Sequence, residues 1–316
     1  MIWTFLRSAI NFSTIYLYGS IGETITEKSG HLNLGTPGIM CIGTIGGCLG
    51  EYIYLQSLED ISMINGFAAV IIPILMTLLF AGLAGLLFSF MTVSLRCNQN
   101  VTGLTITTFG VGFLKFFIEK LCQADDKGYG FSVASKFFAG NNIDGWFGKV
   151  FFSHGVMVYL AIAFAVITTI IFKKTRVGLY LSAVGENPGA ADAAGINVTG
   201  YRYTATILGS AITGLGGLYF IMDYLSGGAS KQIDSFGWLA VALVIFTVWK
   251  PNWSILGSIV FAAMYIASNY LTVNKELFQI LPYAVTILVL IVTSIVNKKS
   301  NQPPASLGLS YFREER

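Results

Sequence analysis

Charged side chains are scarce in this chain of 316 residues. Asp, Glu, Lys and Arg make up 11% of the sequence, whereas hydrophobic residues make up 54% and the mean hydropathy is +0.68. A soluble domain of ordinary composition carries roughly a quarter charged residues. The shortage of charge excludes an ordinary soluble globular protein and predicts a protein that is embedded in a membrane.

Motifs for catalysis, metal binding and nucleotide binding are missing as well. Nothing matches the GxxxxGK[ST] loop that cradles nucleotide phosphates, so we expect no ATPase site in this chain. His31 and His154 lack the neighbouring ligand or carboxylate that a metal site or a general base needs. The four cysteines form no CxxC pair, and no basic patch with interleaved aromatic residues points to nucleic acid. The sequence therefore predicts a chain that is not an enzyme and binds no cofactor, metal or nucleic acid.

Apolar segments long enough to cross a bilayer, roughly 20 residues each, recur along the whole chain. They predict an all-α polytopic membrane protein of about nine transmembrane helices, near residues 5–22, 34–56, 66–93, 101–120, 151–172, 203–222, 234–249, 254–272 and 279–296. The second segment is interrupted by Gly35, Pro37 and Gly38. This interruption indicates a re-entrant or broken piece near residues 30–40.

Small residues recur at a spacing of three to four in two of the apolar segments. The two sets are Ser210, Gly214 and Gly217, and Gly43, Gly47 and Gly50. Small residues on one face of a transmembrane helix let two backbones approach closely. We expect both sets at helix contacts, although GLGG at 214–217 superficially resembles a dinucleotide-binding loop.

Lys and Arg gather in two polar segments, at residues 173–202 and in the tail at 297–316. Cytoplasmic loops of membrane proteins carry an excess of these residues, so both segments are predicted to be cytoplasmic. The four predicted spans between them are consistent with this, because an even number returns the chain to the same side. The loop around 121–150, which contains Asp125, Asp126 and Asp144, then faces out. Counting back places the N-terminus outside.

The stretch GENPGAADAAGIN, residues 185–197, predicts a short helix within the first basic loop. Asn187 suits the N-cap, Pro188 suits the first helical position, and Gly195 suits the left-handed residue that ends a helix. About two turns of helix are too short to be stable alone in water, so this helix needs a surface. That surface could be the protein's own helix ends, lipid headgroups or another protein. The helix lacks the large apolar face and the basic cluster of a lipid-binding helix, which favours a groove on a partner protein.

The surrounding sequence RVGLYLSAVGENPGAADAAGINV, residues 176–198, resembles the cytoplasmic coupling segment of ABC importer permeases of the simple-sugar and nucleoside class. AADAAG at 190–195 is similar to the core of the helix that docks on the ATPase in that family. Asp192 stands where an acidic residue is often seen, and Gly195 matches the closing glycine. Further similar blocks follow the family's order: GETITEKSGHLNLGTPGIM at 22–40, then GWLAVALVIFTVWKPNWSILGSIVF, LPYAVTILVL and PPASLGLSYFREER. The resemblance thus covers nearly the whole chain.

This resemblance implies a single transmembrane permease domain, residues 1–316, that works with three kinds of partner. These are a second, different permease subunit, a cytoplasmic ABC ATPase that uses ATP and Mg, and an extracytoplasmic solute-binding protein. The chain would form half of the path for a nucleoside, with a simple sugar such as a pentose or hexose as the alternative cargo. The residues implied to couple to the ATPase are Glu186, Asn187, Pro188, Ala190, Ala191, Asp192, Ala193, Ala194 and Gly195.

The translocation path is less determined by the sequence. The resemblance suggests that the broken segment around Asn33, Gly35, Pro37 and Gly38 shapes the path, and the alternative is a tight turn between two spans. Glu51 and Asp223 lie near span ends. A carboxylate inside the membrane is a candidate functional residue, but their position within a turn of the outer surface favours simple solvation. An ion-coupled secondary transporter is a more distant alternative, because it needs carboxylates at the midplane and commonly an internal repeat, and neither is clear.

Overall fold

The computed structural model describes residues 2–122, 128–140, 143, 145–267, 275–296 and 302–312. Within these ranges every long regular element is a helix, which confirms the predicted all-α membrane fold. Several residues used above to predict the orientation lie outside the described residues, namely Asp125, Asp126, Asp144, Lys298, Lys299, Arg313 and Arg316.

Within the described residues, nine long helices correspond to the nine predicted spans. They are α1 (Ile2–Lys28), α2 (Thr36–Gln56), α3 (Gly66–Ser89), α4 (Gln99–Cys122), α7 (Val156–Lys174), α10 (Val198–Tyr219), α11 (Ile233–Phe246), α12 (Pro251–Ala267) and α13 (Lys275–Val296). Two of them continue as π-helices, α3 into η2 (Phe90–Ser94) and α10 into η4 (Phe220–Tyr224). Among the helices that the structure describes, five are long and apolar enough to cross a membrane. They are α2, α4, α7, α3 with its extension η2, and α10 with its extension η4.

Shorter helices lie in the connections. They are η1 (Ile61–Met63), α5 (Gly128–Ser135), α6 (Trp146–Phe151), α8 (Arg176–Glu186) and α9 (Pro188–Ala193). The predicted fifth span, 151–172, is therefore shifted: its first residue closes α6, and α7 starts only after Gly155.

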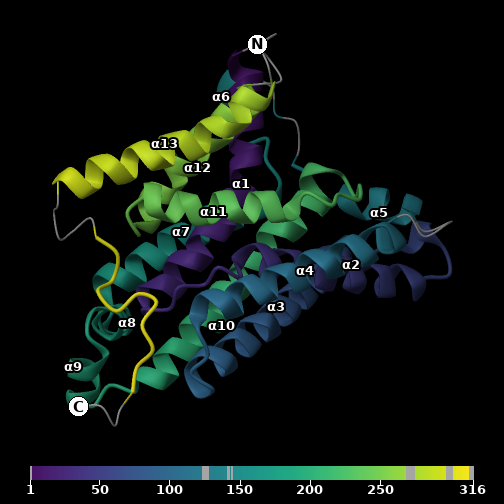
Figure 1. Ribbon diagram of the computed structural model, residues 1–316. Coiled ribbons are helices and arrows are strands. Elements are labelled where there is room, and N and C mark those ends of the chain that lie inside the picture. The colour runs from purple at the N-terminus through teal and green to yellow at the C-terminus, as the bar shows by residue number, and fades with distance from the viewer. Residues whose placement is uncertain are drawn as a thin grey trace.

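The centre of the bundle is formed by α1, α2 and α10. Helix α10 packs on α1, α2 and α3, and α2 also packs on α4. Helices α2, α3, α4 and α10 lie beside one another in Figure 1. On the other side of α1 lie α11 and α12, and α13 packs on those two helices at the periphery. Helix α1 therefore joins the two parts of the bundle.

The predicted small-residue contacts are confirmed at the crossing of α2 with α10 and α3. A Cβ atom on Gly43 would lie 2.6 Å from the Cα atom of Gly214, which is closer than real contacts allow. Gly217 faces Thr44 of α2 in the same way, and Gly85 of α3 faces Ser210. Close backbone approach is thus the role of these residues.

The connections divide between two ends of the bundle. At one end, which we call the tail end, residues 302–312 meet residues 29–35: the Gly308 N–H donates to the Gly30 carbonyl at 3.1 Å. At the opposite end Arg7 donates to the carbonyl of Ser153 at 3.1 Å, and Lys231 forms an ion pair with Glu119 at 2.7 Å. The start of α1 and the tail thus lie at opposite ends, as an odd number of crossings requires.

The interruption near residues 30–40 is a connection between two helices, and no break lies inside α2. Helix α1 ends at Lys28, and α2 begins at Thr36 with Pro37 in its first turn, where a missing N–H costs nothing. The intervening backbone is buried and finds partners nearby: the Asn33 N–H donates to Glu23 at 3.3 Å, and the Gly35 N–H to the Asn33 side chain at 2.9 Å. Irregular backbone is thus covered by protein.

Solvation does not explain Glu51, so that expectation is wrong. The side chain is fully buried, and neither carboxyl oxygen has a hydrogen-bond partner among the described residues. Helix α5 packs on this end of α2 and helps to bury it. The position of Glu51 near the end of a span gives no sign of this packing. Asp223 in η4 is half-buried.

Candidate functional site

The two short helices α8 and α9 follow α7 at the tail end, and both start with a capping side chain. The Thr175 hydroxyl accepts the Gly178 N–H at 3.2 Å at the start of α8. Asn187 ends α8 and begins α9, where its side-chain oxygen accepts the Ala190 N–H at 3.0 Å. Pro188 occupies the first helical position. The start of the short helix is therefore as predicted from its sequence.

The end of α9 is also determined by residues close to it in the sequence. Gly195 has φ +81, its N–H donates to the Asp192 carbonyl at 2.9 Å, and the Ile196 N–H donates to the Ala191 carbonyl at 3.0 Å. These two bonds and the left-handed glycine form the Schellman motif, which satisfies carbonyls that a helix end leaves without partners. The sequence prediction for Gly195 is confirmed.

The two faces of α9 differ in exposure. Ala191 is buried against Val184 and Val198, with Ile196 and Tyr311 at the edge of this cluster. Ala190, Ala193, Ala194 and Gly195 are exposed. We call these four residues the outer face of α9. Of the other residues implied to couple to the ATPase, Glu186 and Asn187 are exposed, and Pro188 and Asp192 are half-buried.

The tail covers the side of α9 that holds the buried Ala191, which we call its inner face, together with the end of α8. The Tyr311 hydroxyl donates to the Asp192 carboxylate at 3.0 Å. The Ser306 N–H donates to the Gly185 carbonyl at 3.0 Å, and the Ala305 N–H reaches Glu186 at 3.4 Å. Asp192 and Glu186 are thus already engaged within the chain. No local sequence signal near α9 indicates these partners, which lie more than a hundred residues later.

The tail also ties the segment to the bundle. The Leu309 carbonyl accepts hydrogen bonds from Gln99 of α4 at 3.4 Å and from Arg202 of α10 at 3.3 Å. Gln99 in turn accepts the Leu32 N–H at 2.9 Å. Helices α8 and α9 are therefore connected through the tail to α4, α10 and the segment that follows α1. A force on α9 has a hydrogen-bonded route into the bundle.

His31 is a structural residue of this junction. The Thr206 hydroxyl donates to the Arg202 carbonyl at 2.9 Å, so its oxygen accepts the His31 Nδ1–H at 3.1 Å. Burial and the nearby Arg202 charge lower the pKa of His31 to about 3. The imidazole is therefore neutral at physiological pH.

The four residues predicted to shape the path lie together and are buried. The Asn33 side chain accepts the Gly35 N–H in the connection before α2, Pro37 packs against Gly237 of α11, and Gly38 packs against Ile106 of α4. A Cβ atom on Gly38 would lie 2.7 Å from the carbonyl carbon of Ile106. The structure thus brings them to contacts among α2, α4 and α11, and their role in a path stays a prediction.

Comparison with known proteins identifies the bundle. Residues 5–290 match the model of a family described as "Branched-chain amino acid transport system / permease component". The chain belongs to this permease family. The resemblance found in the sequence is thereby confirmed, and the permease is a multi-pass membrane protein and a transport subunit.

Three curated relatives align with the permease over nearly their whole length. It is 29% identical over 320 residues to "Nucleoside ABC transporter permease protein NupC" of Lactococcus lactis, covering 96% of this chain and 95% of NupC. It is 28% identical over 316 residues to "Guanosine ABC transporter permease protein NupQ" of Bacillus subtilis, covering 94% and 92%. It is 27% identical over 341 residues to "Putative glucose ABC transporter permease protein TsgC13" of Haloferax volcanii, covering 98% and 97%.

Proposed function

We propose that this permease is the membrane subunit of an ATP-driven nucleoside importer and that α9 is its coupling helix. The observation that carries the proposal is the outer face of α9, which is small, exposed and held by caps at both ends. A face of alanines and glycine lets a partner backbone approach closely, as a groove on an ATPase subunit requires. Residues 302–312 contact α8 and α9 at one end of the bundle. In the sequence, Lys and Arg gather in both polar segments, 173–202 and 297–316, which favours the cytoplasmic side for both.

The division of labour follows from what the chain carries. It has no phosphate-cradling loop, so ATP and Mg belong to a separate cytoplasmic ATPase. A second permease completes the path, and an extracytoplasmic binding protein delivers the solute. Closure of the ATPase would displace α9, and the tail contacts would pass this displacement to α1, α4 and α10 as a rigid-body motion.

The names of the two relatives NupC and NupQ favour a nucleoside as the cargo. A simple sugar is the second candidate, because the name of TsgC13 refers to glucose. Uptake of labelled nucleosides, pentoses and hexoses is to be measured in cells with and without this subunit. Loss of nucleoside uptake alone supports the proposal, whereas loss confined to sugars overturns the nucleoside assignment.

The coupling role has its own test in the reconstituted importer. Ala193→Trp places a bulky side chain on the outer face of α9, and we expect it to separate ATP hydrolysis from uptake. Ala163→Trp makes the same change at an exposed position of α7 and serves as the matched control. Normal uptake by Ala193→Trp would contradict the coupling role. Transport by the purified permease in an ion gradient, with no ATPase present, would favour a secondary transporter instead.

A further inference from the structure

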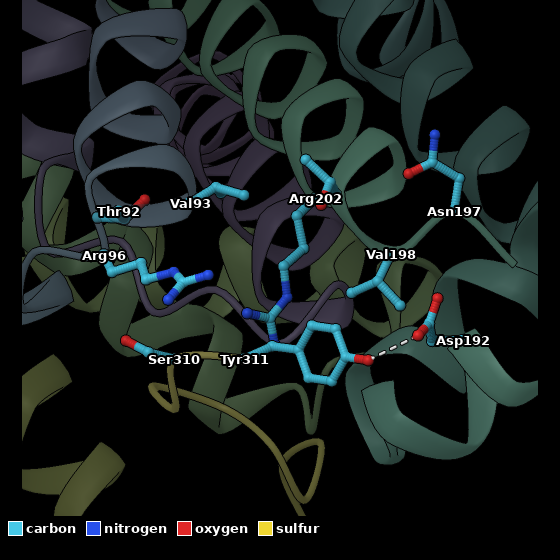
Figure 2. Close-up of a pocket in the computed structure, with 10 residues that line it drawn as sticks. Thr92, Val93, Arg96, Asp192, Asn197, Val198, Arg202, Ser310 and Tyr311 are labelled. Atoms are coloured by element: carbon cyan, nitrogen blue, oxygen red, sulfur yellow. Dashed lines mark hydrogen bonds between the residues drawn. The ribbon is translucent and has the colours of Figure 1, made fainter. Parts of the chain in front are cut away.

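A cavity of about 150 Å³ opens at the tail end beside α9 (Figure 2). Its walls come from four parts of the chain: the end of η2 with the turn after it, α9, the start of α10, and the tail. This volume is enough for several water molecules or for one tetrahedral oxyanion. The cavity is therefore a place where a small ligand would contact all four segments at once.

Arg202 forms one wall and is poorly paired. Its side chain is 3% exposed, and Nη1 donates to the Leu309 carbonyl at 3.3 Å. Nε and Nη2 have no hydrogen-bond partner in the part of the chain that the structure describes, and no carboxylate there lies within 4.0 Å of the guanidinium. A buried cation without an anionic partner is costly, so this guanidinium has unused capacity to bind an anion.

Arg96 lines the same cavity from the turn after η2 (Figure 2). Its φ of +58 is left-handed, and the Cys97 N–H closes the helix end by donating to the Met91 carbonyl at 2.9 Å. A side chain at such a position costs roughly 1–2 kcal/mol relative to glycine. The guanidinium lies 4.8 Å from the centre of the Phe312 ring, which holds it at the cavity. Backbone strain that is retained at a cavity wall is typical of a binding site.

The charges of the lining leave a net positive cavity. Arg96, Arg202 and Asp192 are its charged residues, so two positive charges face one negative charge. The Asp192 carboxylate accepts the hydrogen bond from Tyr311 at 3.0 Å (Figure 2). The hydroxyl-bearing residues Thr92 and Ser310 complete the polar wall. The lining thus offers two cations and hydroxyl groups to a ligand that carries negative charge.

We propose that this cavity binds a phosphate oxyanion between Arg96 and Arg202. The planar guanidinium fork matches the oxygens of a phosphate and forms paired, charge-assisted hydrogen bonds with them. Two sources share this chemistry: the headgroup of an anionic lipid, which suits a basic pocket between helix ends at a membrane surface, and free inorganic phosphate. A bound phosphate would join the α3–α4 turn to α10 directly beside the coupling helix.

The test is direct binding to the purified full chain, delipidated and kept in phosphate-free detergent solution. Inorganic phosphate, dihexanoylphosphatidylglycerol and the phosphate-free dihexanoylglycerol are titrated separately by calorimetry. We expect a phosphate-bearing ligand to bind, and Arg96→Gln and Arg202→Gln each to weaken binding by about tenfold or more. Arg176→Gln removes an exposed positive charge of α8 outside the cavity and should leave the affinity within about twofold.

The arms of the titration separate the outcomes. Tighter binding of phosphatidylglycerol identifies the lipid as the source, and tighter binding of inorganic phosphate identifies the free anion. No binding, binding of dihexanoylglycerol equal to that of phosphatidylglycerol, or equal weakening by Arg176→Gln would overturn the proposal. A cross-link from this cavity to an acidic residue of the ATPase, without phosphate binding, would also overturn it. Arg96 is exposed, so Arg96→Gln keeps the test valid even if Arg202→Gln fails to fold.

Because the readout is binding to the isolated chain, the result is independent of which solute the permease transports. Failure of phosphate binding would therefore leave the proposed import function untouched.

Discussion

Gly189 in the short helix α9 and Gly195 just after its end allow a matched experiment, because only one of the two positions requires glycine. Gly195 has φ +81, and a Cβ atom there would meet nothing within 4 Å, so Gly195→Ala introduces backbone strain without a clash. Gly189 lies in the first turn with an ordinary φ, and a Cβ atom there would meet the Asn187 side chain at a relaxed 3.5 Å. The same substitution should therefore have opposite effects at the two positions.

The magnitudes follow from the two backbone conformations. The left-handed conformation costs alanine roughly 1–2 kcal/mol. Replacing glycine by alanine also lowers the entropy of the unfolded chain, which stabilises the folded state by about 0.4–1 kcal/mol. Gly195→Ala should therefore destabilise α9 by about 1 kcal/mol. Gly189→Ala gains the entropy term without the strain and should stabilise α9 by about 0.5–1 kcal/mol. The two variants should differ by about 1.5–2 kcal/mol, which is roughly a tenfold or larger ratio in local opening.

Amide hydrogen exchange of a peptide covering residues 190–196 measures this opening directly in the purified permease. The Ala194 and Ile196 amides report on it, because they donate to the carbonyls of Ala190 and Ala191. Exchange should be faster than wild type in Gly195→Ala and slower in Gly189→Ala. Equal rates in the two variants, or faster exchange in Gly189→Ala, would refute the account of how α9 is held.

Three further predictions concern the tail, the bundle and pH. Tyr311→Phe removes the hydrogen bond to Asp192 and should cost about 1–3 kcal/mol of local stability, seen as faster amide exchange in α9; unchanged exchange would contradict it. Gly43→Val should sharply reduce the amount of folded permease, because the backbone of α10 lies too close for a side chain. Gly112→Val should not, because no atom lies within 4 Å of a Cβ added there. Size-exclusion chromatography of the two variants checks this. His31 keeps its pKa at about 3 in the fold, so below its unfolded value of about 6.5 only the unfolded chain gains a proton and stability falls. Between pH 6.5 and pH 5 the free energy of unfolding should fall by about 2 kcal/mol more in wild type than in His31→Gln. Thermal unfolding at the two pH values measures this, and an equal fall in both proteins would contradict it.

What the sequence predicts well is either long and apolar or strictly local. The nine long helices follow from runs of apolar residues, because the bilayer leaves the backbone no alternative to helix at that length. The ends of α9 follow from Asn187, Pro188 and Gly195, because capping involves residues only a few positions apart.

What the sequence does not predict depends on segments that are far apart in the chain. Nothing in AADAAG indicates that Ala191 faces inward while Ala190 faces outward, since that choice depends on packing that includes Tyr311 of the tail. Glu51 is another case: its distance from the end of a span suggested water, and the packing of α5 on that end of α2 helps to bury it. The sequence does not distinguish a broken span from a turn between α1 and α2, because glycine and proline interrupt a hydrophobic run both inside a helix and at its first turn.

The tail contacts also impose an order on biosynthesis. Asp192 leaves the ribosome 119 residues before Tyr311, the residue that bonds to it, and Ser306 follows Gly185 by 121 residues. Until the tail has been made, the inner side of α9 and the buried Ala191 lack their cover. A chain that stops short of residue 302 would lack the hydrogen bond from Tyr311 to Asp192 and the contact of Tyr311 with the Ala191 cluster. These contacts of α8 and α9 with the tail therefore form only near the end of synthesis, after the helices between them have been made.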